Sequence, residues 1–298
     1  MSLLRIAKPS HRPTGSRIFQ VVNIFFLSLL AMLCVLPFLH ILAVSLSDAA
    51  SVSANRVGLW PQGFNLNAYR KIFQNHYLLD SFWVTIKRMV LGTAFGMILT
   101  VLTAYPLSFS SREFPGRRIY VVFYFISMMF SGGIIPQYML ISNLHLMDTI
   151  WALVLGGVPV FNVIVLLNFF RQLPRPLYES ARMDGASHLR ILMEIYLPLS
   201  LPSLATLGLL SLVGHWNDWF GGLVYMKSME NYPLQTYLYN TMQNFSEYYP
   251  AFGQDATAAP RQATVAAQTV ISILPVLFAF PVLSKYIKTG LVLGSVKE

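Results

Sequence analysis

The chain has 298 residues, of which 55% are hydrophobic and only 11% are charged. Soluble domains carry about twice that share of charged side chains, so the composition excludes an ordinary soluble enzyme and indicates an integral membrane protein. The single cysteine, Cys34, excludes a disulfide framework and a thiolate metal site.

The formal net charge of +9 is distributed unevenly along the chain. Four segments, 1–17, 107–118, 171–200 and 284–298, together hold fourteen of the 21 basic residues and five of the twelve acidic ones. The whole positive excess therefore lies in these segments, which the positive-inside rule places in the cytoplasm. This distribution predicts that both termini are cytoplasmic, and it explains the charge without nucleic-acid binding.

Six runs with few or no charged residues are long enough to cross a bilayer, which takes about 20 helical residues. They predict an all-α integral membrane fold with six transmembrane helices, in which a cytoplasmic N-terminus of residues 1–17 precedes a transmembrane domain of residues 18–298. A buried helix of a large soluble protein is the alternative for any one run, but six runs in one chain disfavour it. The runs are Ile18–Ser47, Met89–Ser111, Ile119–Met147, Thr149–Phe170, Ile195–Asn217 and Gln262–Ser284.

Residues 48–81, between the first two runs, are expected to form an outer segment with a turn at Trp60–Gly63 and a short surface helix at Asn67–Gln74. In the second run, Gly92 and Gly96 form a small-xxx-small pair that would let another helix pack closely. A flexible kink in a helix that faces lipid is the alternative for this pair.

The third run contains Gly132, Gly133 and Pro136, which disfavour a straight helix. We expect a helix followed by a broken outer segment that reaches Asp148. Non-helical backbone at membrane depth must be satisfied by protein or by a water-filled cavity. The segment is therefore a candidate for lining a substrate pathway, with an ordinary outer loop as the alternative. The sequence GGVP at 156–159 predicts a kink in the fourth run.

Residues 171–202 form the most polar long segment between two apolar blocks, and they predict a bent pair of helices. Pro176 suits the first turn of a helix, and Gly185 offers the left-handed conformation that ends one. Ser187 can cap a second helix. Apolar residues recur in that helix at helical spacing until two prolines interrupt it. These residues are Leu189, Leu192, Met193, Tyr196, Pro198 and Pro202.

This polar segment resembles the EAA loop of ABC importer permeases. The motif Glu179-Ser180-Ala181 is followed by Asp184-Gly185-Ala186 and then by Ile195-Tyr196-Leu197-Pro198, with Ser180 standing where the family usually has alanine. The resemblance implies a cytoplasmic coupling helix that docks into a cleft of a separate ATPase subunit. A loop helix without a partner is the alternative. The implied coupling residues are Glu179, Ser180, Ala181, Asp184, Gly185 and Ala186.

The fifth helix is expected from about Leu201 to Tyr225, with Trp216, Asn217 and Asp218 toward its outer end. These three side chains combine flat apolar faces with hydrogen-bonding groups, as sugar binding requires. An aromatic belt at the membrane interface is the alternative, and it explains the neighbouring Trp219 and Tyr225 without a ligand. A carboxylate near the end of a membrane helix should face a cavity or a partner instead of lipid. We therefore assign the three residues to the substrate route or its outer gate.

Several kinds of chemistry find no support in the sequence. No Gly-Lys dipeptide occurs, so a Walker A loop is excluded, and the six histidines never fall at zinc-binding spacing. We expect no catalytic residue, no metal and no cofactor on this chain, with ATP and Mg²⁺ bound by the partner ATPase subunits. A secondary transporter or a membrane-embedded transferase is the alternative function. Either would place ionisable groups near the middle of a span, and none of the six runs does so.

The resemblance extends over nearly the whole chain to the sugar importers that include the maltose-type permeases, and it implies the type I ABC importer permease fold. It implies a permease subunit that forms the pathway for a sugar or oligosaccharide delivered by an extracytoplasmic binding protein. The implied partners are a second permease subunit, in a heterodimer, and an ATPase dimer at the bacterial inner membrane. The cytoplasmic tail, 285–298, resembles an ending that reaches between the two ATPase subunits; a frayed terminus is the alternative.

Overall fold

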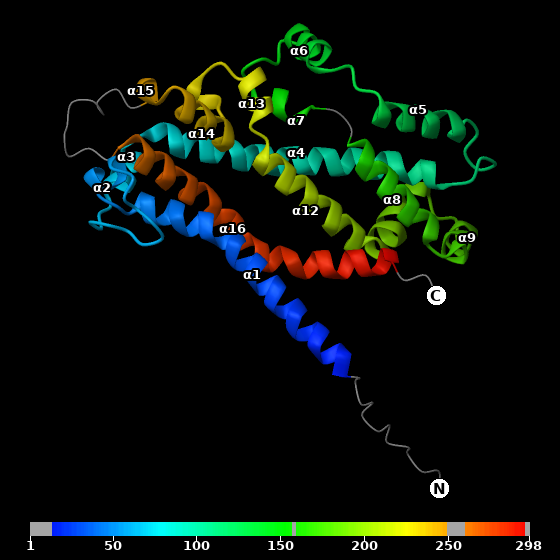
Figure 1. Ribbon diagram of the computed structural model, residues 1–298. Helices are drawn as coiled ribbons and strands as arrows, with labels where there is room; N and C mark the ends of the chain where they lie inside the picture. The colour runs from blue at the N-terminus through cyan, green and yellow to red at the C-terminus, as the bar shows by residue number, and fades with distance from the viewer. Residues whose placement is uncertain (1–13, 157–158, 249–259, 296–298) are drawn as a thin grey trace. The chain divides into compact units, whose positions relative to one another are not determined.

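The computed structural model describes residues 14–156, 159–248 and 260–295, which contain helices and no strand (Figure 1). The chain divides into two compact units. The first comprises residues 1–70 and 251–270, and the second comprises residues 71–250 and 271–298. The all-α prediction is therefore confirmed for the described residues.

The first unit contains the long apolar helix α1 (Thr14–Ser45) and the short helix α2 (Ala49–Ser53). Residues 19–35 of α1 are all exposed, as expected for a helix that meets lipid along its length. Asp48 caps α2, because its carboxylate accepts the Ser51 N–H at 2.8 Å. The next helix, α3 (Asn67–Gln74), has the bounds that the sequence predicts.

The second unit is built around α4 (His76–Ser108), against which α8 (Val160–Gln172) and α12 (Leu201–Asn217) pack (Figure 1). The predicted start at Met89 is wrong, because α4 begins at His76, where Asn75 accepts the Tyr77 N–H at 3.0 Å. The charged residues Lys87 and Arg88 set the N-terminal limit of the predicted apolar run, but the helix continues through both of them. The predicted outer segment is therefore shorter than residues 48–81.

The small residues of α4 allow close approach, as predicted. Gly92 is buried against His215 of α12, and a Cβ at Gly92 would lie 2.6 Å from the imidazole ring. One turn further on, a Cβ at Gly96 would meet Pro159 at 3.7 Å, which is ordinary van der Waals contact. Gly92 is therefore the point at which α12 needs a residue without a side chain.

The third and fourth predicted runs are broken helices. α5 (Arg117–Met129) and α6 (Ile134–Asn143) meet at 112°, and Gly133 between them has a φ of +83°, so the predicted break is confirmed. In the fourth run α7 (Ile150–Val154) and α8 are separate helices; Gly157 and Val158 of the predicted kink lie outside the described residues.

The fifth helix, α12, ends at Asn217 and not near Tyr225 as predicted. α13 (Phe220–Tyr225), the turn η2 (Met229–Asn231), α14 (Leu234–Gln243) and α15 (Phe245–Tyr248) follow it.

The last helix, α16 (Arg261–Ser295), continues past the predicted end of the sixth span at Ser284. The predicted tail is therefore helical as far as Ser295, and residues 296–298 lie outside the described part of the chain.

In the described residues, α1, α4 and α16 are long and apolar enough to cross a membrane individually. Two bent pairs would each make one further span. They are α5 with α6, and residues His188–Leu199 with α12, which meet at 80°. The apolar helix α8 has 13 residues and represents the remaining predicted span. The described residues thus contain six apolar segments, of which the two bent pairs and the run that holds α7 and α8 are interrupted.

Candidate functional site

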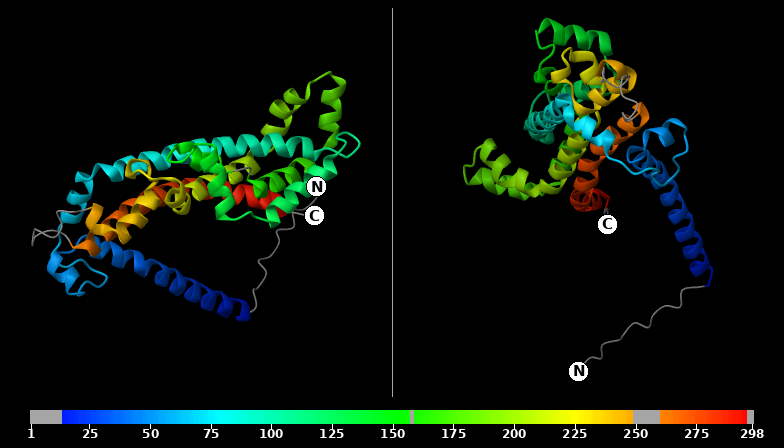
Figure 2. Two further views of the ribbon diagram at one scale, coloured as in Figure 1. Left: turned by 90° about the horizontal axis from the view of Figure 1, so that it is seen from above. Right: turned by 90° about the vertical axis from the view of Figure 1, so that its left-hand side faces the viewer.

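The predicted bent helix pair is present in the polar segment. α9 (Arg175–Met183) has Pro176 in its first turn, and Gly185, which follows its C-cap Asp184, has a φ of +77° in the left-handed region. The Ala186 N–H donates to the Ala181 carbonyl at 2.9 Å, which closes the end of α9. Residues 175–199, yellow-green in Figure 2, project beyond α4 within the second unit.

The second helix of the pair begins as predicted, because Ser187 Oγ accepts the Arg190 N–H at 3.3 Å and caps α10 (His188–Ile191). α10 then passes into the π-helical turn η1 (Leu192–Tyr196) and the short α11 (Leu197–Leu199). In η1 the Leu197 N–H reaches the Leu192 carbonyl, one residue further back than in an α-helix.

The π turn changes which side chains of this helix are buried. Ile191, Leu192 and Tyr196 are buried in the core that α4 and α8 also form. Leu189 and Met193, which the predicted apolar stripe placed on the same face, are 66% and 57% exposed. The predicted stripe is therefore correct for Leu192 and Tyr196 and wrong for Leu189 and Met193, and the wider turn brings Ile191 onto the buried face with Tyr196.

The predicted coupling residues divide between a packed side and an open side of the bend. Ala181 is buried and Ala186 is half-buried against the same core. The exposed members of the set are Glu179, Ser180, Asp184 and Gly185.

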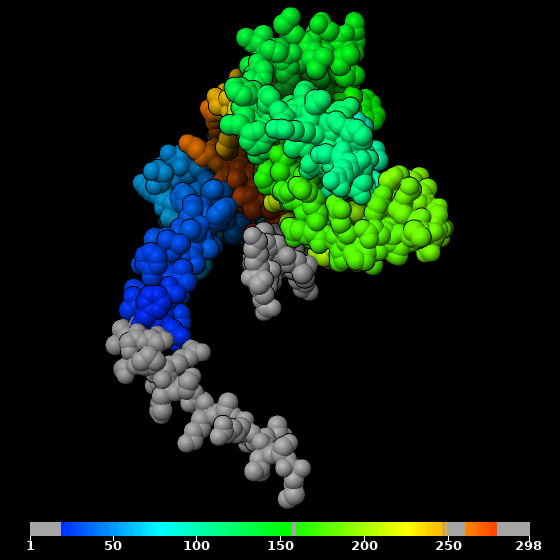
Figure 3. Space-filling view, turned by 90° about the vertical axis from the view of Figure 1, so that its right-hand side faces the viewer, coloured from blue at the N-terminus to red at the C-terminus, as the bar shows by residue number. Residues whose placement is uncertain are grey.

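Beside these exposed residues, Met183 is 88% exposed, and a Cβ at Gly185 would meet open space. A groove of about 490 Å³ follows this surface on the projecting yellow-green lobe (Figure 3). It includes Ser180, Ala181, Asp184, Ala186, Arg190 and Glu194.

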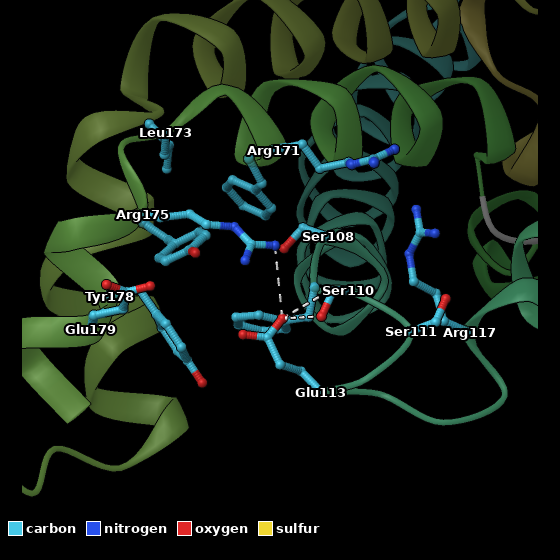
Figure 4. A pocket seen from close by; sticks show the side chains of 13 residues that line it. Ser108, Ser110, Ser111, Glu113, Arg117, Arg171, Leu173, Arg175, Tyr178 and Glu179 are labelled. Carbon is cyan, nitrogen blue, oxygen red and sulfur yellow. Dashed lines mark hydrogen bonds and ion pairs between the residues drawn. The ribbon is translucent and has the colours of Figure 1, made fainter. Parts of the chain in front are cut away.

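A second cavity, of about 460 Å³, lies between the turn after α4 and the start of α9 (Figure 4). Glu113 at its centre accepts hydrogen bonds from the hydroxyl and the backbone N–H of Ser110 at 2.7 and 2.9 Å. These bonds lower the pKa of the Glu113 carboxyl and keep it ionised. Arg175 approaches it at 4.0 Å, so α9 and the turn are linked by opposite charges.

An aromatic cluster joins α4 to the beginning of α10. The Tyr105 hydroxyl donates to the His188 carbonyl at 3.1 Å. The Tyr105 ring packs edge to face against Phe109 and Tyr196, with centroids 5.0 and 5.1 Å away. The end of α4 near Ser108 is therefore in direct contact with the bend.

The predicted pathway residues at the end of α12 have different environments. Trp216 is 6% exposed and packs edge-on against Phe82 at 5.9 Å, whereas Asn217 is exposed. Asp218 lies where α12 ends, and its Oδ1 accepts the N–H groups of Phe220 and Gly221 at 3.1 Å. Asp218 therefore closes one helix and supports the first turn of the next.

The structure adds Arg88, which the sequence analysis missed. Arg88 is 4% exposed, forms an ion pair with the Asp218 carboxylate, and donates from Nη1 to the Asp218 carbonyl at 3.1 Å. It lies close to the middle of α4, so the expectation that no span carries a central ionisable group is wrong. The spacing of the buried polar residues Ser81, Thr85 and Arg88 on one helical face was the available signal.

The glycines assigned to the pathway, Gly132 and Gly133, are both exposed. A Cβ at Gly132 would meet Pro136 at 3.6 Å, and one at Gly133 would meet open space. Neither added Cβ would meet a residue at the end of α12, where the other predicted pathway residues lie. The described part of the chain contains no cluster of three His, Cys, Asp or Glu side chains suited to a metal ion.

Asp148, at the end of the broken segment, is held by a different set of bonds. Its carboxylate accepts the Lys227 and Ser228 N–H groups at 2.9 and 3.1 Å and the Ser228 hydroxyl. Burial raises the pKa of Asp148, but these hydrogen bonds outweigh it and lower the pKa to about 2. The loop before α7 is thus fixed to the segment after α13.

Comparisons with known proteins agree with this architecture. Residues 10–291 match the family described as binding-protein-dependent transport system inner membrane component. Protein LplC of Bacillus subtilis (strain 168) is 39% identical over 96% of this chain and 97% of its own length. The polygalacturonan/rhamnogalacturonan transport system permease protein YtcP of the same organism is 36% identical, over 95% and 99%.

A solved structure, a bacterial ABC transporter involved in the import of the acidic polysaccharide alginate, contains a similar chain. It superposes with a TM-score of 0.84 at 32% identity and covers 94% of this chain and 99% of its own. The fold is that of a type I ABC importer permease, a non-catalytic membrane subunit whose importer hydrolyses ATP in another subunit. This multi-pass chain belongs to the family of binding-protein-dependent inner membrane transport components.

Proposed function

We propose that this permease subunit imports an oligosaccharide delivered by an extracytoplasmic binding protein, and that residues 171–202 couple it to an ATPase dimer. Relatives named for carbohydrate transport and the solved alginate importer support an oligosaccharide as the substrate. Asn217 is the exposed candidate for contact with it, and the ionised Asp218 lies beside it. Gly132 and Gly133 remain candidates for a second wall of the route.

The observation that carries the coupling role is the exposed bend at Gly185. A short helix ends there on a left-handed glycine, and the polar residues Glu179 and Asp184 point outward beside the exposed Met183. A projecting helix with small and polar residues suits a groove in a partner protein. In this assignment both chain termini and the bend face the cytoplasm, while Asp148 faces the other side.

The remaining partners follow from an importer of this kind. A second, different permease subunit completes the pathway, and ATP and Mg²⁺ bind the ATPase subunits and not this chain. Closure of the ATPases moves the bend, and the helices then rock between inward-facing and outward-facing states.

The coupling role is tested by Gly185→Val in the importer reconstituted with its ATPase and binding protein. Valine cannot adopt a φ of +77° without strain, so we expect at least a tenfold weaker ATPase association and a matching loss of oligosaccharide uptake. Gly116→Val is the matched control, because Gly116 also has a positive φ, +84°, and open space around it. Wild-type association and uptake in Gly185→Val would refute the assignment.

The substrate is tested by uptake into the same vesicles of a neutral and a uronate-containing oligosaccharide, each with a binding protein that recognises it. Uptake of either that depends on ATP supports the proposal. Uptake that follows a proton or sodium gradient without ATP would instead support a secondary transporter. Asn217→Ala and Asp218→Ala should each lower the uptake if these residues line the route.

A further inference from the structure

Helix α4 contacts two sites that a transport cycle must connect. Near Ser108 it packs against α10 through Tyr105 and Phe109, and near its middle it holds the α12–α13 break through Arg88. The helix is uninterrupted between these points, which are about 25 Å apart at 1.5 Å per residue. Figure 2 shows α4, in cyan, as one continuous helix.

We propose that α4 is a rigid link between the coupling bend and the α12–α13 break, and that Arg88 is the positioning residue that attaches it to the break. The proposal rests on the proposed function, because the bend is taken to meet the ATPase. It assigns to Arg88 a part in transport beyond the stability of the fold.

The attachment at Arg88 has two points. Nη1 binds the Asp218 carbonyl and Nη2 the carboxylate, so the planar guanidinium fixes both the backbone and the side chain of this residue. Nε has no hydrogen-bond partner within the described residues, so the hydrogen bonds of Arg88 run through Asp218. A lysine would retain the charge but could not reproduce this geometry.

The Asp218 carboxylate passes this constraint to α13. Its Oδ1 holds the N–H groups of Phe220 and Gly221, while Oδ2 pairs with Arg88. A displacement of α4 must therefore move the start of α13 or break a largely buried ion pair. Separating such a pair is costly, because it leaves an uncompensated charge in a medium of low dielectric constant.

A second hydrogen bond binds the segment after α13 to the same helix, because Thr85 Oγ1 accepts the Leu234 N–H at 2.7 Å. Within that segment, Thr236 donates to the Trp219 carbonyl at 2.8 Å, which ties α14 to the start of α13. Residues 218–236 are thus attached to α4 at two neighbouring turns of one face.

At its other end, α4 is connected to the bend by direct side-chain contacts. The Tyr105 hydroxyl donates to the carbonyl of His188, the first residue of α10, which lies three residues after Gly185. The Phe109 ring lies 5.7 Å from His188 and 5.0 Å from Tyr178 of α9. Both helices of the bend therefore contact α4 or Phe109, the residue that follows it.

The test uses the complete importer in vesicles, with ATPase subunits and loaded binding protein, and measures assembly, stimulated ATP hydrolysis and uptake. We expect Arg88→Lys to lower the uptake per ATP hydrolysed at least tenfold. Lys87→Gln, on the neighbouring exposed position of α4, should leave this ratio at its wild-type value.

A double variant separates positioning from stability. Arg88→Met with Asp218→Asn removes both charges and leaves neither unpaired, and asparagine retains an acceptor for the N–H groups of α13. We expect the double variant to assemble like wild type while its uptake per ATP stays at least tenfold low. Assembly and uptake both at wild-type levels would show that the pair only stabilises the fold, and would overturn the proposal.

The inner attachment is tested independently by Tyr105→Phe, which removes one hydroxyl and keeps the ring. We expect a several-fold loss of binding-protein stimulation with normal assembly; wild-type stimulation would refute α4 as the link. A wild-type complex that fails to bind ATPase or to import any oligosaccharide would instead refute the proposed function, so the two failures are distinguishable.

Discussion

Helices of the second unit end at two polar sites, Gly185 and Asp218, and these two helix ends are stabilised in opposite ways. At Gly185 one left-handed residue ends a helix, and the groups that close it lie within six residues. At Asp218 a side chain ends one helix and supports the next, and its charge is balanced by Arg88, 130 residues away in the sequence. The first bend presents its polar groups outward, whereas the second buries much of its own.

Because of this difference, the two sites suit different roles in transport. The bend at Gly185 is set by local geometry, so its open side is available to a partner without loss of the fold. The break at Asp218 depends on α4, so it responds when α4 moves. Substitutions at the two places should therefore differ in kind.

The largest effect is expected where α12 crosses α4. Gly92→Ala should destabilise the importer by up to about 3 kcal/mol, because the new Cβ would overlap His215. Gly96→Ala, with its nearest contact at 3.7 Å, should be neutral or stabilising, since alanine favours a helix by about 1 kcal/mol over glycine. Thermal unfolding of the detergent-purified importer compares them. Equal melting temperatures would mean that α12 does not need this close approach.

The next effect concerns the contact between α4 and α14. Thr85→Val should cost about 2 kcal/mol, because it leaves the buried Leu234 N–H without its acceptor. Thr100→Val is the control, since Thr100 is equally buried but bonds only to the Gly96 carbonyl of its own helix. Thermal unfolding should show a larger drop in melting temperature for Thr85→Val than for Thr100→Val. A smaller drop for Thr85→Val would contradict the role of Thr85 in holding α14 against α4.

At the coupling bend the expected cost is smaller and local. Ser187→Ala should destabilise α10 by about 1 kcal/mol, because the Arg190 N–H loses its cap. Ser180→Ala, at an exposed position with a weak 3.2 Å bond to Leu177, should change little. Hydrogen exchange of residues 188–196 reports this local loss. If Ser187→Ala accelerated hydrogen exchange equally in α12 and α13, the conformation of the bend would not be determined locally.

The smallest effect tests a long-range contact that is exposed. The pKa of Asp148 is lowered to about 2, so its hydrogen bonds stabilise the folded chain fully above about pH 5 and are lost as the pH falls from about 4 to 2. Asp148→Asn should therefore lower the melting temperature at pH 7, with a difference from wild type that shrinks toward pH 3. A difference that is constant with pH would mean that the ionised carboxylate is not what holds the loop.

The parts of the fold that the sequence predicted are those with local causes. Pro176, Gly185 and Ser187 each act within one turn of chain, and α3 is bounded by the residues that predicted it. The break at Gly133 is equally local. The coupling role of residues in the bend is a prediction from a motif, and the structure shows which of these residues are exposed.

The missed features have causes that lie elsewhere in the chain. The predicted apolar run began only after Lys87 and Arg88, because a hydropathy pattern treats every charged residue as unpaired. Asp218 was chosen as a pathway residue for its charge, and its ion pair with Arg88 appears only when α4 and α12 are packed together. The aromatic contact between Tyr105 and α10 is likewise invisible in either segment alone.

The π turn at residues 192–196 holds one extra residue between the bend and the helix that follows it. A π turn contains one residue more than the α-helical turn it replaces, so deleting the exposed Met193 should restore a regular α-helical turn and leave the segments on either side in nearly the same orientation. Ala181, Ala186 and Ile191 would then keep their places in the core. Homologous chains can therefore keep this surface with one residue fewer between Gly185 and Pro198, provided that their helix makes a regular turn there.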